Sequence, residues 1–336
     1  MRLVEVGADD RALFDTWYAV YRRSAQEGLG DLSAAWTGEE LWQGMQRRTG
    51  RYEHRDLLMT HDGAPVAAAM VRLPLLDNRD RALIDLHVDP PARRRGHGTA
   101  LLAHLEEWAR DRGRTVVLAE SRWSYDAGPT GAGWPGPAFA AARGYALALG
   151  DVQRRLALPV ADGLLERLAA EAAPTAYPIR TWHGPLPEDL LTAYAELDAL
   201  VETEAPTGDL DVEPETPDVE AVRRANEQLV AQGRVRYGAI VFDPAGAAVG
   251  YTEIVVPGAE PGRAYQWGTL VRREHRGHRL GLALKVANLA RLQELRPEVT
   301  HVLTYNAEVN AHMIGVNEAL GFEPVGRLGE FQKRLR

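Results

Sequence analysis

Apolar positions in this chain alternate over short stretches and recur at helical spacing over longer ones. Residues 82–88 alternate and are rich in branched side chains, which predicts a half-buried strand. Residues 101–108 carry leucines and a tryptophan three or four positions apart, which predicts an amphipathic helix. The turn between them contains three consecutive arginines and two glycines. Backbone N–H groups at a helix start attract anions, so this turn is a candidate phosphate cradle.

The same construction occurs again further along the chain. A strand ending at Val271 leads into a turn at residues 272–281 and then a leucine-rich helix. Three pairs of residues lie 183 positions apart: Val88 and Val271, Arg93 and Arg276, Gly98 and Gly281. Gly144-Tyr145 and Gly321-Phe322 form a later matching pair, 177 positions apart. This register predicts an internal duplication, with domains at residues 1–158 and 176–336 joined by a linker helix at 159–175.

Other apolar patterns fill in the two copies. Alternation predicts hairpins at residues 56–73 and 237–256, and a strand at residues 302–310 that leads into a helix. Residues 125–137 contain so many glycines and prolines that we expect a loop there, either a lid or clasp or a tolerated surface insertion.

Composition narrows the function classes. The 336 residues are 45% hydrophobic, enough for two ordinary cores, and the formal net charge of −8 argues against general nucleic-acid binding. The absence of cysteine excludes disulfides and thiolate chemistry. We find no signal peptide and no apolar run of membrane-spanning length, so we expect no membrane partner and a cytoplasmic location.

At these motifs the chain resembles the GNAT superfamily of acyl-coenzyme A dependent N-acetyltransferases, in its tandem two-domain form. The first copy matches the family signature at these residues: Val88, Pro90, Arg93, Gly96 and Gly98. The second copy matches at Val271, Arg276 and Gly281, but Arg279 stands where the first glycine is expected. The resemblance implies an α/β (α+β) fold with two GNAT-like domains, each a mixed, mostly antiparallel sheet flanked by helices.

The resemblance also implies that acetyl-coenzyme A is the cofactor and that the two loops hold its pyrophosphate. The implied contacts in the first copy are Val88, Arg93, Arg94, Arg95, Gly96, His97, Gly98 and Thr99. Those in the second copy are Val271, Arg276, Gly277, His278, Arg279, Leu280, Gly281, Asn306 and Asn310. A solvated turn remains the alternative for the three arginines, and a helix N-cap for Asn310. No third ligand accompanies His275 and His278, so we expect no metal.

The candidates for proton transfer are less specific. Asp85 and His87 share one face of their strand, and Glu253 lies within a strand of the other copy, so these three are the base candidates. Structural roles for Asp85 and His87 are the alternative. Ala140 and Asn317 occupy the positions where the family often has a tyrosine acid, which leaves water, Tyr305 or another group to protonate the thiolate.

The expected activity is acetyl transfer to the amine of a small molecule, in specialised metabolism or in resistance. Carboxylates accumulate at residues 202–220, either as a solvated loop or to attract a cationic amine. The second copy is slightly favoured for the chemistry, with the first binding cofactor or acting as a scaffold. A non-catalytic acyl-coenzyme A sensor and an aminoacyl transferase are the alternatives, and monomer and homodimer both remain open.

Overall fold

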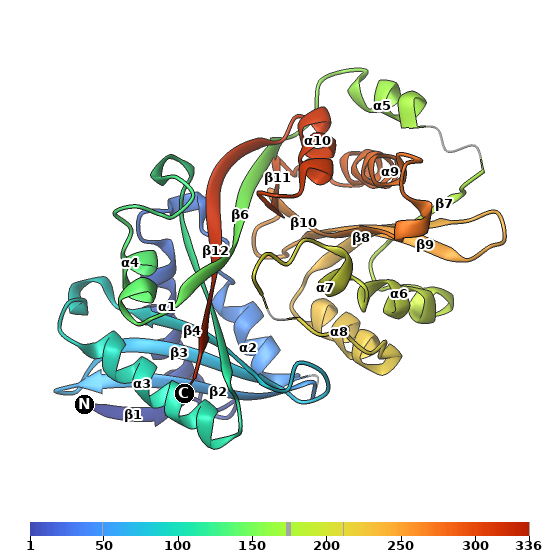
Figure 1. Ribbon diagram of the computed structural model, residues 1–336. Helices are drawn as coiled ribbons and strands as arrows, with labels where there is room; N and C mark the ends of the chain where they lie inside the picture. The colour runs from blue at the N-terminus through green and yellow to red at the C-terminus, as the bar shows by residue number, and fades with distance from the viewer. Residues whose placement is uncertain (49, 173–175, 211, 336) are drawn as a thin grey trace. The chain divides into compact units, whose positions relative to one another are not determined.

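The computed structural model describes residues 1–48, 50–172, 176–210 and 212–335. These residues form two compact units (Figure 1). The first contains Met1–Gly150, Gly208–Leu210 and the chain from Gly326 onward, and the second contains the remaining residues between Asp151 and Val325. The last strand of the chain therefore belongs mainly to the first unit.

The first unit is built on a mixed sheet with the strand order β1-β2-β3-β4-β5-β12. Its strands are β1 (Arg2–Glu5), β2 (Tyr52–His61), β3 (Ala64–Pro74), β4 (Arg81–Val88), β5 (Val116–Ser124) and the C-terminal part of β12 (Glu323–Arg334). Strands β4 and β5 are parallel, and the other neighbouring strands are antiparallel. The predicted hairpin at residues 56–73 is confirmed as β2 and β3, with both strands longer than predicted.

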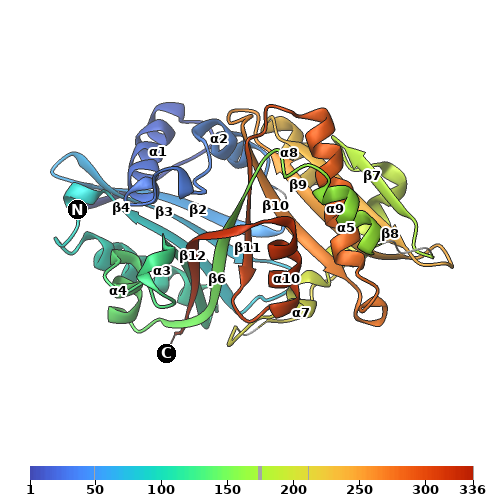
Figure 2. The same ribbon diagram turned by 90° about the horizontal axis from the view of Figure 1, so that it is seen from above.

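Helices cover both faces of this sheet. They are α1 (Arg11–Gln26), α2 (Gly38–Gln46), α3 (His97–Asp111) and α4 (Pro135–Ala142). Helices α1 and α2 lie on one face and α3 and α4 on the other (Figure 2). Asp10 caps α1, because its carboxylate accepts from the backbone N–H of Leu13 at 2.9 Å. The α1 face buries Phe14 and Trp17, and the α3 face buries Leu101 and Leu105.

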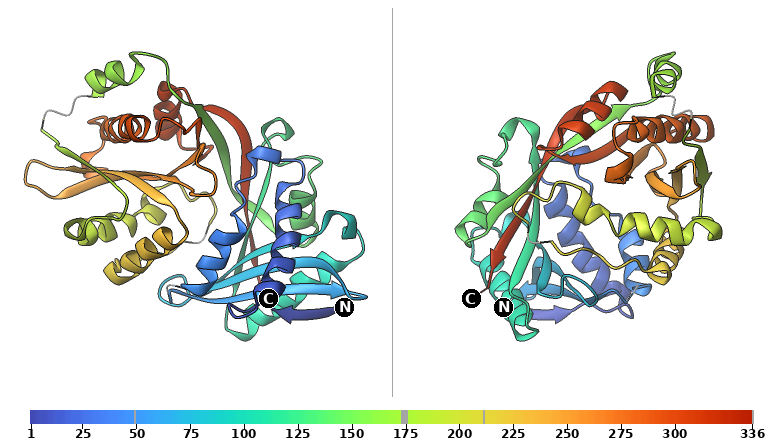
Figure 3. Two further views of the ribbon diagram at one scale, coloured as in Figure 1. Left: turned by 180° about the vertical axis from the view of Figure 1, so that it is seen from behind. Right: turned by 45° about the vertical axis from the view of Figure 1, so that its right-hand side comes forward.

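The second unit repeats this arrangement with the strand order β6-β11-β10-β9-β8-β7. Its strands are β6 (Ala146–Ala157, of which Asp151–Ala157 lie in this unit), β7 (Ile179–His183), β8 (Val235–Phe242), β9 (Ala248–Val256), β10 (Arg263–Val271) and β11 (His301–Ala307). Its helices are α5 (Leu164–Ala172), α6 (Leu191–Asp198), α7 (Val201–Glu204), α8 (Val219–Ala231), α9 (Leu280–Leu295) and α10 (Ala311–Leu320). Helices α5, α9 and α10 lie on one face, and α6 and α8 on the other (Figure 3).

Each unit takes its last strand from the other half of the sequence. β6 follows α4 in the chain but pairs with β11 of the second unit, from Asp151↔Ala307 to Ala157↔His301. β12 follows α10 but pairs with β5 of the first unit, from Gly326↔Ser124 to Arg334↔Val116. The duplicated halves therefore exchange their final strands.

The two central parallel strands of each unit separate partway along their length. β4 and β5 pair only from Arg81↔Val116 to Ile84↔Ala119, and β10 and β11 only from Arg263↔His301 to Tyr265↔Leu303. Beyond those points β4 and β10 run on toward the arginine-rich loops. Beyond those points the facing backbone groups of the two strands do not pair with each other.

The predicted loop at residues 125–137 needs one correction. Residues Pro135–Pro137 form the first turn of α4 rather than part of the loop. Proline is compatible with the first turn of a helix, because the N–H groups there have no intrahelical partner. The remainder of this segment contains a short 3₁₀ turn, Tyr125–Ala127, and folds over Trp123, whose indole donates to the carbonyl of Gly128 at 2.8 Å.

Candidate functional site

The duplicated loops have the same internal contact. In the first unit, Arg93 Nε donates to the carbonyl oxygen of Val88 at 3.2 Å. In the second, Arg276 Nε donates to the carbonyl oxygen of Val271 at 3.1 Å. Each arginine therefore closes its own loop by reaching back to the end of the preceding strand.

Both loops also need left-handed backbone at the same two positions. Arg94 and Gly277 are equivalent and have φ values of 62° and 89°. Gly96 and Arg279 are equivalent and have φ values of 86° and 54°. Glycine and arginine have thus exchanged places between the copies, and Arg279 keeps the loop conformation that its side chain disfavours. The departure at Arg279 does not alter the path of the backbone.

In the second unit, carboxylates outside the loop fix its arginines. Glu204 Oε2, at the end of α7, lies 2.7 Å from Arg276 and 3.5 Å from Arg273. Arg279 donates to the carbonyl oxygen of Glu171 at 3.2 Å. A Cβ atom added to Gly281 would have no neighbour within 4 Å. The start of α9 is therefore open for a ligand to approach its N–H groups.

The first loop is more closely packed. Arg93 pairs with Glu27, and a Cβ atom added to Gly98 would lie 3.1 Å from Val88 and 3.5 Å from Phe139 of α4. His97 is buried beside the ring of His61, 5.1 Å away. Of the other predicted contacts in this copy, Arg94, Arg95 and Thr99 are exposed.

A bulge marks the point where β10 leaves β11. The pairing of β10 with β9 shifts between Gln266 and Thr269, and Gln266 Nε2 donates to the carbonyl of Glu253 at 2.7 Å. Thr304 Oγ1 reaches the carbonyl of Gln266 at 3.4 Å, at the last contact before the strands separate. A Cβ atom on Gly268, within the bulge, would lie 2.6 Å from the hydroxyl oxygen of Tyr251.

On the α6 face, a polar cluster adjoins this bulge. Tyr251 donates from its hydroxyl to Asp198 Oδ1 at 3.2 Å, and Tyr194 donates to Glu253 Oε1 at 3.1 Å. Arg236 Nε lies 2.9 Å from Glu253 Oε2, with both side chains buried. Burial, and then the negative charge of Glu253, raise the pKa of Asp198 to about 6.

Glu253 and Asp198 have different surroundings, which bears on their suitability as the base. Glu253, predicted as a base, is enclosed by Arg236 and Tyr194, and accepting a proton would break a buried ion pair. Asp198 is only partly buried and titrates near neutral pH. Sequence reasoning missed Asp198, since its proximity to the bulge depends on how α6 packs against β9.

On the α9 face, a second polar network lies beside β11 and joins side chains of β6, β11, α9 and α10. Asn306 accepts from Arg154 Nε and from Asn317 Nδ2, both at 3.1 Å. Lys285 Nζ donates to Asn317 Oδ1 at 2.7 Å. All four side chains are buried, and burial lowers the pKa of Lys285 to about 7. Asn306 thus lies where it was predicted, but Lys285 has no counterpart among the predicted site residues.

Four other predicted residues of the second unit have simpler positions. Asn310 is the N-cap of α10, because its side chain accepts from the backbone N–H of Met313 at 3.1 Å. Tyr305 is partly buried in β11, opposite Gln153 of β6. His278 lies with its ring 5.2 Å from that of Tyr177, and Leu280 is buried at the start of α9.

The first unit brings together the two base candidates of its sequence. His87 Nε2 lies 2.8 Å from Asp85 Oδ1, and the ring of Tyr21 packs edge-on against His87 at 4.7 Å. Partial burial by itself would raise the pKa of Asp85, but attraction and a hydrogen bond to His87 lower it to about 2. This dyad lies on the part of β4 that has separated from β5.

Three carboxylates of the acidic segment make structural contacts. Asp218 caps α8, Glu220 pairs with Arg223, and Glu204 holds the second loop. The side chain of Glu202 and the whole of Asp211 lie outside the described residues.

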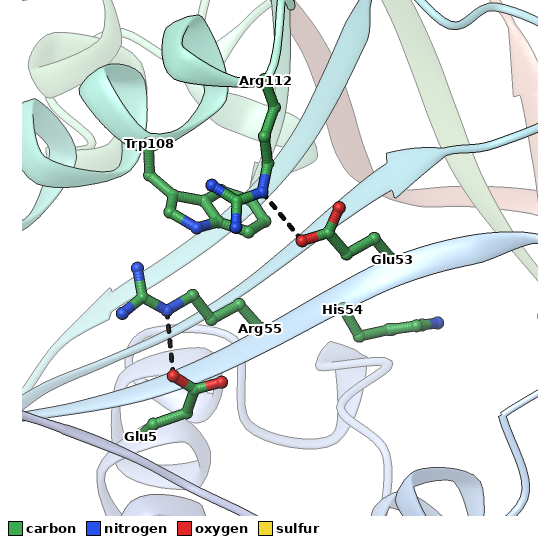
Figure 4. A pocket seen from close by; sticks show the side chains of 6 residues that line it. All are labelled: Glu5, Glu53, His54, Arg55, Trp108 and Arg112. Atoms are coloured by element: carbon green, nitrogen blue, oxygen red, sulfur yellow. Dashed lines mark hydrogen bonds and ion pairs between the residues drawn. The ribbon is translucent and has the colours of Figure 1, made fainter.

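A surface pocket of the first unit lies elsewhere, between β1, β2 and α3 (Figure 4). The guanidinium groups of Arg55 and Arg112 lie 5.6 and 4.1 Å from the ring of Trp108, and each pairs with a glutamate. Its charges are thus mutually compensated. None of the residues that line it is a predicted site residue: Glu5, Glu53, His54, Arg55, Trp108 and Arg112.

Comparisons with known proteins agree with this geometry. Residues 15–123 match the model of the acetyltransferase (GNAT) family. The chain is similar to the solved structure of a tandem GNAT protein from the clavulanic acid biosynthesis pathway, with 32% identity over 99% of this chain and 98% of that one, and a TM-score of 0.78. It has the fold of a GCN5-related N-acetyltransferase from Sphaerobacter thermophilus, at 18% identity over 99% and 96% of the two chains and a TM-score of 0.63. A comparison with curated proteins finds no significant match. Among the described residues, every helix is too short or too polar to cross a membrane.

Proposed function

Because the chain belongs to the GNAT acetyltransferase family, in its tandem form, we propose that it acetylates the amine of a small molecule and that the second unit carries the reaction. The observation that carries this proposal is the Asp198–Tyr251 pair beside the β10 bulge. Asp198, whose pKa is raised to about 6, would be the proton acceptor at the point where the sheet opens.

The second loop fits an acyl-coenzyme A. Backbone N–H groups at the start of α9 and the guanidinium groups of the loop provide donors for a pyrophosphate, and Gly281 leaves the approach open. Acetyl-coenzyme A supplies an activated thioester as the acetyl donor. The predicted contacts of this copy, Val271, Arg276 to Gly281, Asn306 and Asn310, are the residues that we propose to hold it.

Residues of the α6 face would receive the amine. The attacking amine must be neutral, so a base has to remove a proton as the new bond forms. Asp198 would accept that proton, directly or through the hydroxyl of Tyr251. Glu253, held by Arg236 and Tyr194, would position Tyr194.

A small amine suits this face better than a polypeptide. The groups that would receive it are partly or fully enclosed between α6, β8 and β9. The carboxylate of Asp198 would favour a cationic acceptor, which loses a proton before attack. The similar tandem GNAT protein is described as coming from the clavulanic acid biosynthesis pathway, which supports a role in specialised metabolism. We assign the first unit, with its packed loop, to cofactor binding or support.

Calorimetric titration with acetyl-coenzyme A would test the assignment of the second unit. A Cβ atom at Gly281 meets no neighbour within 4 Å, so the indole of Gly281→Trp should fill the approach to the start of α9 and abolish one binding site, and the melting temperature recorded with it checks that the fold is kept. Arg95→Glu, in the first loop, is the comparison variant, because that side chain is exposed. Gly98→Trp is unsuitable, since its packing against Val88 would confuse stability with binding.

Turnover would then be followed as release of free thiol, with a panel of small amines, for the wild type and both variants. We expect Gly281→Trp to lose transfer and Arg95→Glu to retain it. The reverse result would move the chemistry to the first unit and its Asp85–His87 pair. Binding of acetyl-coenzyme A without turnover of any amine would favour a sensor over an enzyme acting on small amines.

A further inference from the structure

Lys285 is a buried amine that the proposed function does not use. It lies on α9, one turn after Gly281, and its side chain points into the space between α9 and α10. It is 3% exposed, and its ammonium donates to Asn317 Oδ1. Its other contact is the ring of Phe322, with Nζ 5.7 Å from the centroid. No carboxylate pairs with Lys285 in the part of the chain that the structure describes, and burial of an unpaired lysine is costly, so a purely structural role for it would be expensive.

The surroundings of Lys285 carry positive charge and few compensating groups. Arg154 of β6 reaches the same network through Asn306, and its nearest carboxylate, on Glu318 of α10, is 3.9 Å away and mainly exposed. Asn317 and Asn306 link the two cations without neutralising either of them. Such a site favours a ligand that develops negative charge.

The position of the network suggests which ligand atom that is. Thr304 contacts Gln266 where the strands separate, and Asn306 follows two residues later on the same face of β11. The Asp198–Tyr251 pair adjoins the bulge of β10 from the opposite face. The Asp198–Tyr251 pair and the Asn306 network therefore lie on opposite faces of the sheet, near the point where β10 and β11 separate. The Asp198–Tyr251 pair is on the proposed acceptor side, and the Asn306 network is on the side of α9 and its loop.

We infer that Lys285, positioned by Asn317, is the proton donor to the sulfur of the departing coenzyme A. This inference rests on the proposed function of the second unit. As the amine nitrogen bonds to the acetyl carbon, the carbon–sulfur bond breaks and sulfur leaves with the electron pair. Lys285 gives one proton to that sulfur and becomes a neutral amine. Asp198 takes one proton from the amine nitrogen, and exchange with water restores both groups.

The ionisation of Lys285 agrees with this role. Burial alone lowers its pKa to about 7, so it holds its proton loosely near neutral pH. An ordinary lysine holds its proton too tightly to be an efficient acid there. The charged groups of the network are Arg154 and Glu318, and they belong to β6 and α10.

The chain contains two lysines, Lys285 and Lys333, which makes a direct test possible. Isotopic labelling of lysine would give two side-chain resonances in the full-length protein. Lys333, paired with Glu106 in the first unit, serves as the internal reference. The probes are coenzyme A and desulfo-coenzyme A, which lacks the thiol. We expect the Lys285 resonance to respond to pH differently with the two ligands, and the Lys333 resonance to be the same with both.

A second measurement uses the ultraviolet absorbance of the thiolate. The thiol pKa of bound coenzyme A should be lower in the wild type than in Lys285→Met, because a nearby ammonium group stabilises the thiolate. Transfer by Lys285→Met should fall about 10²–10⁴-fold, the range for loss of a general acid, while Lys333→Met transfers normally. A thiol pKa that is equal in wild type and Lys285→Met would overturn the inference.

The outcomes separate this inference from the proposed function. If coenzyme A binds but both ligands give the same Lys285 resonance, Lys285 is structural and the proposed function is unaffected. If Gly281→Trp leaves binding unchanged and the Lys285 resonance never moves, both proposals fail. If Lys285→Met does not fold, the resonances of the wild type still decide between these results.

Discussion

Arg276 and Glu204 form an ion pair with 2.7 Å between Nη2 and Oε2, and it ties the second loop to the end of α7. The equivalent Arg93 pairs with Glu27, immediately after α1. In both units the arginine also donates to the carbonyl at the end of its strand. The guanidinium therefore orders the loop at two points, which leaves the backbone N–H groups free to bind an anion.

Removal of the carboxylate charge in Glu204→Gln should weaken binding of acetyl-coenzyme A at the second site. The pair is partly exposed, so the loss should correspond to about 0.5–1 kcal/mol, or roughly a two- to fivefold increase in Kd. Calorimetry would measure it. Glu27→Gln, the matched change in the first unit, should leave the second site unaltered. Equal weakening of the second site by both variants would contradict this role for Glu204.

Asp198→Asn should lower the rate of transfer and remove part of its pH dependence. Burial and Glu253 raise the pKa of Asp198 to about 6, so in the wild type kcat/KM should rise as the pH increases through 6 and the carboxylate loses its proton. The rate of the variant should be about 10²–10⁴-fold lower than that of the wild type. Its pH–rate profile should also lack the rising limb near pH 6.

The control for Asp198→Asn is Asp85→Asn in the first unit. Asp85 is ionised above a pH of about 2, so its replacement should not alter a limb near pH 6. A pH–rate profile for each variant, recorded with one amine, makes the comparison. If Asp85→Asn removes the limb and Asp198→Asn does not, the base belongs to the first unit.

The repeated loops were predictable because short-range chemistry determines them. The strand, the arginines, the glycines and the helix start are contiguous in sequence, and their spacing is the same in both copies. The predicted proximity of Asp85 and His87 also follows from alternation along one strand. These are properties of a segment and do not require knowledge of its neighbours.

The exchange of β6 and β12 could not be predicted in the same way. Each strand has an equally suitable partner in its own half of the sequence, and hydrophobic alternation does not distinguish the two. The Asp198 and Lys285 environments are also long-range. Lys285 falls among the apolar residues of α9, and its role depends on Asn317, 32 positions away on another helix.

The stability of the protein should depend on the ionisation of Lys285. Burial lowers its pKa to about 7, so between pH 7 and 10 the unfolded chain binds a proton that the folded protein does not. Its contribution to the free energy of unfolding therefore increases as the pH rises, by about 2 kcal/mol between pH 7 and 9.

Lys285→Met should lack this increase. Denaturant unfolding at pH 7, 8 and 9 would give the slope for each protein. Lys333→Met should keep the slope of the wild type, because that lysine pairs with Glu106 and is partly exposed. Parallel slopes for wild type and Lys285→Met would show that the folded protein keeps Lys285 charged throughout this range.

Two glycines should respond in opposite directions to alanine, which tests the exchange of the final strands. A Cβ atom on Gly329 of β12 would lie 2.5 Å from the ring of Trp123 and 2.8 Å from Leu147, so Gly329→Ala must displace buried side chains of the first unit. We expect a loss of about 1–3 kcal/mol in the free energy of unfolding. Gly315 of α10 faces open space, so Gly315→Ala should gain about 0.5–1 kcal/mol from helix propensity. Hydrogen exchange should show the Gly329→Ala loss in β5, and protection lost only in β11 would contradict the pairing of β12 with the first unit.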